Sequence, residues 1–237
     1  MTLLLWDVDG TLIRAGGLGR EPFQAAVASA IGGAIDPRLH EQVQMSGKTD
    51  PQIARELLVL ASVSEDDVER HLPEVLRLLE SNLGSVEASI TERGRVLPGV
   101  PEVLERCAAL GPDVVVSTLL TGNLAGNALV KLRAFGLERW VDLRVGAYGS
   151  DHHDREELVP IALAKATSAY GRRFSASSTW VIGDTPRDLA CARAGGARCV
   201  LVATGRFGRD ELEACGADAV LDDLSDVDRV LQLFGLS

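Results

Sequence analysis

The sequence has little of several residue types that point to particular classes of protein. Aromatic residues make up 4% of its 237 residues, and the 24 Lys and Arg are outnumbered by 34 Asp and Glu, which gives a formal net charge of −10. This acidic balance argues against a general binder of nucleic acid or of anionic membranes, because both need a positive surface. A small anionic substrate remains compatible with it, since one local positive site is enough.

Cysteine and long apolar runs are also scarce. The four cysteines are widely spaced and form no C-x-x-C pair, and their apolar or helical surroundings favour buried free thiols in a reducing compartment. The longest uncharged run, 114–130, contains Ser, Thr and Asn and is too polar for a membrane span. The N-terminus shows no signal-peptide pattern. We therefore expect a cytoplasmic protein that contacts neither membrane nor nucleic acid.

The strongest signal lies at residues 3–11, Leu-Leu-Leu-Trp-Asp-Val-Asp-Gly-Thr. Four apolar residues in a row predict a strand buried on both faces, as in a parallel sheet. Asp7 and Asp9 follow at a spacing that puts both side chains on the same side of an extended chain. Gly10 lets the backbone turn, and Thr11 adds a hydroxyl. Because two neighbouring carboxylates repel each other, the stretch predicts a cation site at the end of a strand.

The hydrophobic pattern divides the chain into two kinds of structure. After a glycine-rich connection at 15–19, which we interpret as a hinge, the pattern is helical to about Glu92. One expected helix there carries the apolar stripe Leu72, Val75, Leu76, Leu79 and Leu83. From Val96 onward, strands expected at 114–116, 141–145, 179–182, 199–202 and 219–221 alternate with helices. Such alternation predicts an α/β fold with a parallel sheet, formed by 1–14 and 93–237, and an inserted all-α domain at 15–92.

Polar residues follow a second predicted strand, the one that begins near residue 114. Thr121, Gly122 and Asn123 combine a hydroxyl, a glycine that permits close backbone approach, and the start of a helix. Together they form a small anion cradle. Sites in open α/β sheets lie beyond the carboxyl ends of strands, so this cradle is expected beside the first aspartates.

A third strand end supplies two more carboxylates. Asp184 follows the strand expected at 179–182, where it is placed to complete a Mg²⁺ site with Asp7 and the backbone carbonyl of Asp9. Asp188 has two interpretations. It is either part of a helix cap that begins at Thr185, or a support for the metal site.

These three segments, Asp-x-Asp-Gly-Thr, Thr-Gly-Asn and Gly-Asp-x-x-x-Asp, together resemble the motifs of the haloacid dehalogenase superfamily. The resemblance covers essentially the whole chain. It implies a Rossmann-like core, a helical cap inserted after the first strand, and Mg²⁺-dependent chemistry through a covalent aspartyl intermediate. It also implies that Asp7 is the nucleophile and Asp9 the general acid and base. The predicted phosphate or substrate contacts are Thr11, Thr121, Gly122 and Asn123, and the predicted metal ligands are Asp7, Asp9, Asp184 and Asp188.

One family feature is absent at its usual place. The family has a lysine on or just before the helix that follows the third core strand, and the corresponding segment here, 149–157, has none. We predict that Arg155 supplies this positive charge as a catalytic group, with a planar fork in place of an ammonium. Lys131 and Lys165 are the alternatives, and both are expected on helix surfaces.

A further substrate contact is predicted in the helical domain. Gly47, Lys48 and Thr49 precede a helix that is expected to begin with Asp50 as its N-cap. Caps of the family often present a substrate-selecting loop at such a place. We therefore predict Lys48 as a candidate substrate contact, with a solvated lysine as the alternative.

The activity predicted from this resemblance is Mg²⁺-dependent hydrolysis of a small phosphorylated metabolite, similar to that of phosphoglycolate phosphatase-type enzymes. A sugar-phosphate mutase of the same family would share every motif named above. A haloacid dehalogenase would not need Asp9, and a non-catalytic binding protein on the same fold would not need the full set of carboxylates. Phosphatase and mutase are therefore the two leading interpretations.

Overall fold

The computed structural model describes residues 1–17, 20–81 and 83–236, and of 83–86 the backbone alone. Leu18 and Gly19 of the predicted hinge, and the side chain of Leu83 in the predicted apolar stripe, therefore lie outside the described part of the chain.

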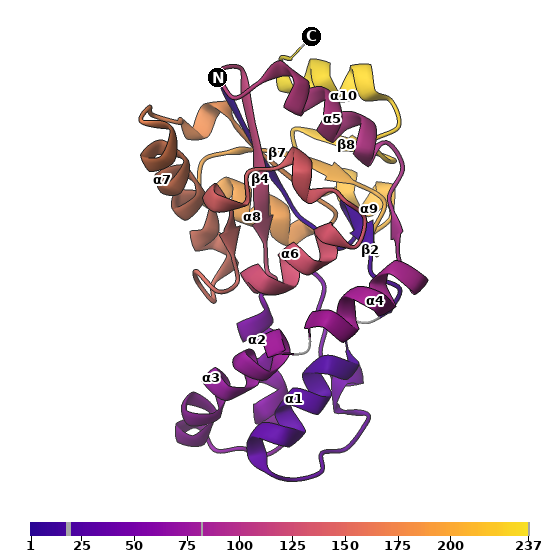
Figure 1. The fold of residues 1–237 in the computed structure, drawn as a ribbon, viewed down its shortest axis with the longest axis vertical. Coiled ribbons are helices and arrows are strands. Elements are labelled where there is room, and N and C mark those ends of the chain that lie inside the picture. Colours follow the sequence, from indigo (N-terminus) through magenta and orange to yellow (C-terminus); the bar gives the residue numbers. More distant parts are fainter. Residues whose placement is uncertain (18–19, 82, 237) are drawn as a thin grey trace.

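A parallel sheet forms the centre of the molecule (Figure 1). Within the described residues it has six strands, in the order β5 (Ala147–Tyr148), β4 (Val115–Thr121), β1 (Thr2–Trp6), β6 (Thr179–Gly183), β7 (Arg198–Val202) and β8 (Ala219–Leu221). The first strand of the chain thus lies in the middle, between β4 and β6. Leu4 and Trp6 face one side of the sheet and Leu3 and Leu5 the other, each fully buried. A strand covered on both faces explains the uninterrupted apolar run.

Helices cover both faces of this sheet, as the alternating pattern predicts. On one face lie α5 (Val100–Leu110), α6 (Ala125–Arg133) and α10 (Val227–Phe234), and on the other α7 (Leu158–Tyr170), α8 (Pro186–Ala194) and α9 (Arg209–Glu213). Trp6 packs edge-on against Phe234, with ring centroids 5.9 Å apart. The α/β core is therefore a Rossmann-like fold. Short 3₁₀ segments occur at Leu39–Gln42, Glu138–Trp140, Leu143–Val145, Arg155–Glu157 and Ala176–Ser178.

The described residues between 21 and 93 form helices and the loops that join them. The first three of these helices lie at the opposite end of the molecule from the two chain termini, and the fourth lies nearer the sheet (Figure 1). This helical segment contains α1 (Glu21–Ile31), α2 (Asp50–Leu60), α3 (Glu65–Ser81) and α4 (Leu83–Arg93). Helices α1, α2 and α3 share a hydrophobic cluster of their own, which Leu124 of the sheet region also joins. Two short strands, β2 (Ile13–Arg14) and β3 (Arg95–Val96), pair antiparallel where the chain leaves the sheet and returns to it. The division into domains at 15–92 stays a prediction.

Two expectations about individual segments are wrong. The strand expected at 141–145 is a 3₁₀ turn at Leu143–Val145, and the strand lies instead at β5. Cys215 is exposed, because it follows the short helix α9 at the surface, whereas Cys107, Cys191 and Cys199 are buried free thiols. No helix in the described residues is both long enough and apolar enough to span a membrane.

Candidate active site

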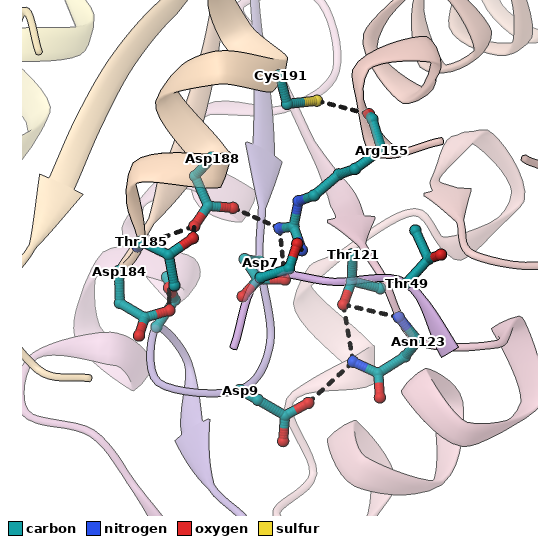
Figure 2. A network of polar contacts seen from close by, with 12 residues as sticks. Asp7, Asp9, Thr49, Thr121, Asn123, Arg155, Asp184, Thr185, Asp188 and Cys191 are labelled. Carbon is teal, nitrogen blue, oxygen red and sulfur yellow. Dashed lines mark hydrogen bonds and ion pairs between the residues drawn. The ribbon is translucent and has the colours of Figure 1, made fainter. Parts of the chain in front are cut away.

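Three neighbouring strands place polar residues at one edge of the sheet. Asp7 directly follows β1, Thr121 ends β4, and Asp184 directly follows β6. The backbone amide of Asp7 donates to the carbonyl of Ile182 at 2.9 Å, which continues the β1–β6 pairing up to the carboxylates. Figure 2 shows Asp7 between Asp184 on one side and Thr121 on the other. The three motif segments at the ends of β1, β4 and β6 therefore meet at one edge of the sheet.

Arg155 joins Asp7 to Asp188 inside the protein. Its Nη2 lies 3.0 Å from Asp7 Oδ1 and also donates to Asp188 Oδ1. A second guanidinium nitrogen, Nη1, donates to the carbonyl of Gly47 in the helical segment at 3.3 Å. Arg155 is 5% exposed, and Asp188 and Asp7 raise its pKa despite the opposing effect of burial. Arg155 is thus a permanent buried cation directly beside Asp7, where the family's lysine was missing.

The two remaining acids of this group surround the same space. One oxygen of each of Asp7, Asp184 and Asp188 lies within 4.8 Å of the others. Burial raises the pKa of Asp7 to about 6, with Arg155 opposing the shift. Burial, followed by the charges of Asp188 and Asp7, raises the pKa of Asp184 to about 8. Three buried carboxylates beside one guanidinium are short of positive charge.

This group of oxygen donors fits a hard divalent cation such as Mg²⁺. The backbone at two glycines packs closely against the Asp184 carboxylate. A Cβ atom on Gly205 would lie 1.6 Å from Asp184 Oδ2, and one on Gly10 would lie 2.4 Å from it. A side chain at either position would therefore displace the Asp184 carboxylate. Thr11, predicted as a phosphate contact, is buried and donates weakly to Asp184 Oδ1 at 3.4 Å.

Asp188 makes the hydrogen bonds of a helix cap. Its Oδ2 accepts from the backbone amide and the hydroxyl of Thr185 at 3.0 and 2.7 Å, while Oδ1 accepts from Arg155. Both oxygens are thus engaged by protein donors at the start of α8. Asp188 orients Arg155 and closes the helix end, and its role as a direct metal ligand stays a prediction.

Lys131 makes a second charged group around Asp9. Its Nζ lies 2.5 Å from Asp9 Oδ2 and 2.6 Å from Asn123 Oδ1. Asn123 in turn donates through Nδ2 to Asp9 Oδ2 at 2.9 Å and to Thr121 Oγ1 at 2.8 Å (Figure 2). Asp9 and Asp50 raise the pKa of Lys131, although burial alone would lower it. Lys131 therefore stays protonated.

The expectation that Lys131 lies on a helix surface is wrong. Side chains on an α-helix tilt toward its N-terminus, so a long side chain two turns into α6 reaches back to the residues at the start of the helix. Lys165, the other alternative, donates to the carbonyl of Gly146 at 2.9 Å and to Asp151 at 2.6 Å. It contacts neither Asp7 nor Asp9. A charged residue eight positions after Asn123 was the signal that could have identified Lys131.

The start of α2 docks onto the loops at the sheet edge through a backbone amide and a side-chain hydroxyl. The amide of Asp50 donates to the carbonyl of Gly122 at 2.7 Å, and the Thr49 hydroxyl donates to the carbonyl of His153 at 2.6 Å. A Cβ atom on Gly122 would lie 2.1 Å from the carbonyl oxygen of Lys48, so the close approach needs glycine. Gly122 thus contacts the helical segment.

Sequence reasoning missed the role of Asp50. The N-cap of α2 is Thr49, whose hydroxyl accepts from the amide of Gln52, and not Asp50 as expected. Asp50 is the first helical residue, and its carboxylate accepts from the backbone amide of Leu124 at 2.8 Å and from Asn127 at 3.2 Å. It therefore ties the start of α2 to the start of α6.

A cavity of about 600 Å³ opens from these groups between the sheet edge and the helices. Lys48 lines it, but its ammonium lies 2.5 Å from each carboxylate oxygen of Glu56. One part of the cavity, which we call the reaction end, is lined by Asp7, Asp9, Asn123, Lys131, Arg155 and Asp184. The cavity lining also includes apolar side chains of the helical segment, Phe23, Met45, Ile53, Leu79 and Ile90. A cavity of this size accommodates a small organic molecule.

Comparisons with known proteins agree with this architecture. The model of the HAD-hydrolase-like family matches residues 157–227. Over 135 residues, 56% of this chain, the sequence is 29% identical to "Probable phosphatase IndB" of Dickeya dadantii, and the match spans 55% of that protein.

Solved structures match over nearly the full chain. A family IA, variant 3 HAD hydrolase from Entamoeba histolytica has a TM-score of 0.67 at 19% identity and covers 99% of this chain and 100% of its own. CbbY from Rhodobacter sphaeroides, solved in complex with phosphate, has a TM-score of 0.66 at 19% identity, with 96% of both chains covered. A predicted phosphoglycolate phosphatase from Haemophilus somnus has a TM-score of 0.58 at 17% identity and covers 98% of both chains. At these identities the structures show the shared fold.

Proposed function

We propose that this chain is a phosphatase of the haloacid dehalogenase superfamily, which hydrolyses a small phosphate monoester through an aspartyl-phosphate intermediate on Asp7. The observation that carries the proposal is the pairing of Asp7 with Arg155 Nη2 at 3.0 Å, with Asp9 two residues further along the same strand end. A carboxylate attacks phosphorus only where the repulsion between two anions is offset. Arg155 provides part of that offset from a fixed position.

The first chemical step transfers the phosphoryl group to the protein. A carboxylate oxygen of Asp7 forms a bond to phosphorus while the bond from phosphorus to the leaving alcohol oxygen breaks. Asp9 donates its proton to that oxygen, so the product leaves as a neutral alcohol. The side chain of Asp9 is 42% exposed, whereas that of Asp7 is 7% exposed, which suits Asp9 for exchange of protons with the cavity.

The second step returns the protein to its starting state. Asp9 removes a proton from a water molecule, whose oxygen bonds to phosphorus, and the bond between phosphorus and Asp7 breaks to release inorganic phosphate. Lys131 and Asn123 hold the Asp9 carboxylate through both steps. Thr121, Gly122 and Asn123 form the cradle for the phosphate oxygens at the start of α6.

Asp7, Asp184 and the backbone carbonyl of Asp9 would hold Mg²⁺, with Asp188 and Thr11 as supports. The ion supplies positive charge that offsets both the buried carboxylates and the phosphate. In the same proposal, residues 15–92 act as a cap over the site, the substrate is a small phosphorylated metabolite, and the location is cytoplasmic.

The proposal is tested by phosphate release from a generic aryl phosphate and from a panel of small metabolite phosphates, with Mg²⁺ or with EDTA. Asp7→Asn is assayed beside the wild type. We expect release that requires Mg²⁺ and is lost in the variant. Release that persists in Asp7→Asn would contradict the assignment of the nucleophile. A mutase would instead move phosphate within a sugar phosphate and require a bisphosphate activator, which product analysis separates from hydrolysis.

A further inference from the structure

Four arginines gather at the part of the cavity that lies at the junction with the helices. Arg14, Arg93, Arg95 and Arg206 all line it, and all are exposed. Arg14 in β2 is directly opposite Arg95 in β3. Directly opposite residues of an antiparallel pair project to the same face, so these guanidinium groups share one side of the ribbon. Arg93 ends α4 two residues earlier, and a Cβ on Gly16 would lie 2.6 Å from its Cβ.

This arginine cluster, as we call the four residues, carries uncompensated positive charge. Among the residues that the structure describes, none of the four forms an ion pair with a carboxylate. The acidic residues that line the cavity are Asp7, Asp9, Asp50 and Asp184, at the reaction end. Like charges directly opposite each other destabilise a pair of strands. In a chain with a net charge of −10, four unpaired arginines on one cavity wall indicate a site for an anion.

One member of the arginine cluster is held in place by the backbone. Arg14 Nη2 donates to the carbonyl of Thr204 at 2.6 Å and to that of Gly205 at 3.4 Å. These residues immediately precede Arg206, so the bond connects β2 to the loop that carries another member of the cluster. The same loop borders Asp184, since the Cβ position of Gly205 touches that carboxylate. The cluster and the reaction end are therefore two parts of one cavity.

Part of the cavity lining is apolar. Phe23, Ile53, Leu79 and Ile90 are buried residues of the helical segment that line the cavity. They offer contact to a hydrocarbon or ring and no hydrogen-bond partner for a polar one. The cavity thus combines a phosphate site, an apolar wall and a second positive site.

We propose that the arginine cluster binds a second anionic group of the substrate, distinct from the phosphate that is cleaved. The substrate class is a phosphate monoester whose apolar body carries a second phosphate or a carboxylate. The proposal rests on the proposed phosphatase function for its catalytic assay. Arginine suits this role because its fork binds carboxylate and phosphate with two parallel hydrogen bonds.

The test compares compounds that differ in the second anion alone. Alkyl monophosphates are assayed beside alkanediol bisphosphates and ω-carboxyalkyl phosphates of the same chain lengths, at constant ionic strength and with Mg²⁺. We expect kcat/KM to be at least about tenfold higher for a doubly anionic compound at one preferred chain length, the effect of one charge-assisted hydrogen bond. The two anionic series show whether phosphate or carboxylate is preferred.

The variant R93Q/R95Q is expected to lose that preference. Arg229→Gln, an exposed arginine of α10 outside the cavity lining, is the matched control and keeps the preference. Equal kcat/KM for singly and doubly anionic compounds at every length in the wild type would overturn the proposal. So would a preference that R93Q/R95Q retains.

A binding measurement separates this proposal from the phosphatase proposal. If the wild type hydrolyses none of the compounds, the phosphatase proposal fails, and calorimetric titration of the same compounds decides on the arginine cluster. Tighter binding of the doubly anionic compound, lost in R93Q/R95Q, would support the cluster. Equal Kd values for the two classes would overturn it.

Discussion

The two aspartates of the first motif are held by two cations in different surroundings, and the difference separates their tasks. Arg155 reaches Asp7 and Asp188 in the interior, where all three side chains are at most 7% exposed. Lys131 reaches Asp9 at the cavity wall, where the Asp9 side chain is 42% exposed. In the proposed mechanism the interior region, formed by Asp7, Arg155 and Asp188, fixes the nucleophile and its charge. The wall region, formed by Asp9 and Lys131, holds the carboxylate that exchanges protons with substrate and water.

Asp7→Asn is the largest change that can be made to the interior region. We expect phosphate release to fall by roughly 10⁴-fold or more, as for the loss of other enzymatic nucleophiles, because an amide oxygen does not attack phosphorus at a useful rate. Burial raises the pKa of Asp7, so the ionised carboxylate costs free energy in the fold. The thermal midpoint of the variant should therefore be equal to or above that of the wild type. A large fall in the midpoint would mean that the carboxylate is mainly structural.

Substitutions of Arg155 show whether the interior region needs the geometry of the guanidinium or only its positive charge. Arg155→Met leaves Asp7 and Asp188 buried without their cation, so we expect a loss of stability of about 3 kcal/mol as well as of activity. Arg155→Lys keeps the charge but cannot reach Asp7, Asp188 and Gly47 together. Its kcat should fall by about tenfold to a hundredfold with a smaller loss of stability. Full activity in Arg155→Lys would show that the fork geometry is irrelevant.

Replacement of Lys131 tests whether its ion pair with Asp9 supports the role proposed for Asp9. Lys131→Met should lower kcat by about a hundredfold, the usual contribution of a positioned general acid, because Asp9 and Asn123 lose their shared cation. The loss should be greater for alkyl phosphates than for aryl phosphates, since a good leaving group needs less protonation. Lys165→Met is the matched control, because Lys165 contacts Asp151 and not Asp9. An equal loss for both leaving groups would contradict a role through Asp9.

Lys48 gives the smallest expected effect. Its ammonium is already paired with Glu56, so Lys48→Ala should change KM by about threefold or less, the effect of one weak ion pair, with kcat unchanged. KM is measured across the substrate panel in parallel with Glu56→Gln, which frees the ammonium. A rise in KM of more than tenfold in Lys48→Ala would show that Lys48 leaves Glu56 to bind substrate.

The sheet and the motif residues could be predicted because their signals are local. The run before Asp7 specifies a doubly buried strand, and polar residues after three strand ends specify a common edge. The segment at 141–145 was wrongly predicted to be a strand because Val141, Leu143 and Val145 alternate with charged residues, as apolar residues do in a half-buried strand. The carboxylate of Asp142 accepts from the amide of Arg144 at 3.1 Å and starts a 3₁₀ turn there instead.

The contacts that cross between distant parts of the chain could not be predicted in this way. Lys131 occupies a helix position that sequence spacing alone assigns to the surface, and its contact with Asp9 joins residues 122 positions apart. Asp50 satisfies the local rule for a helix start, yet its carboxylate binds Leu124 and Asn127 in another helix. The arginine cluster similarly depends on the pairing of β2 with β3, which no periodic pattern in the sequence predicts.

Chemical trapping of the phosphorylated protein tests directly whether Asp7 is the nucleophile. Wild type and Asp7→Asn are mixed with substrate and Mg²⁺, quenched during turnover, and treated with borohydride, which reduces an aspartyl phosphate to homoserine. Mass spectrometry of the tryptic peptide that ends at Arg14 then locates the change. We expect homoserine at position 7 in the wild type and none in the variant. Homoserine at position 9, or its absence during rapid phosphate release, would contradict it.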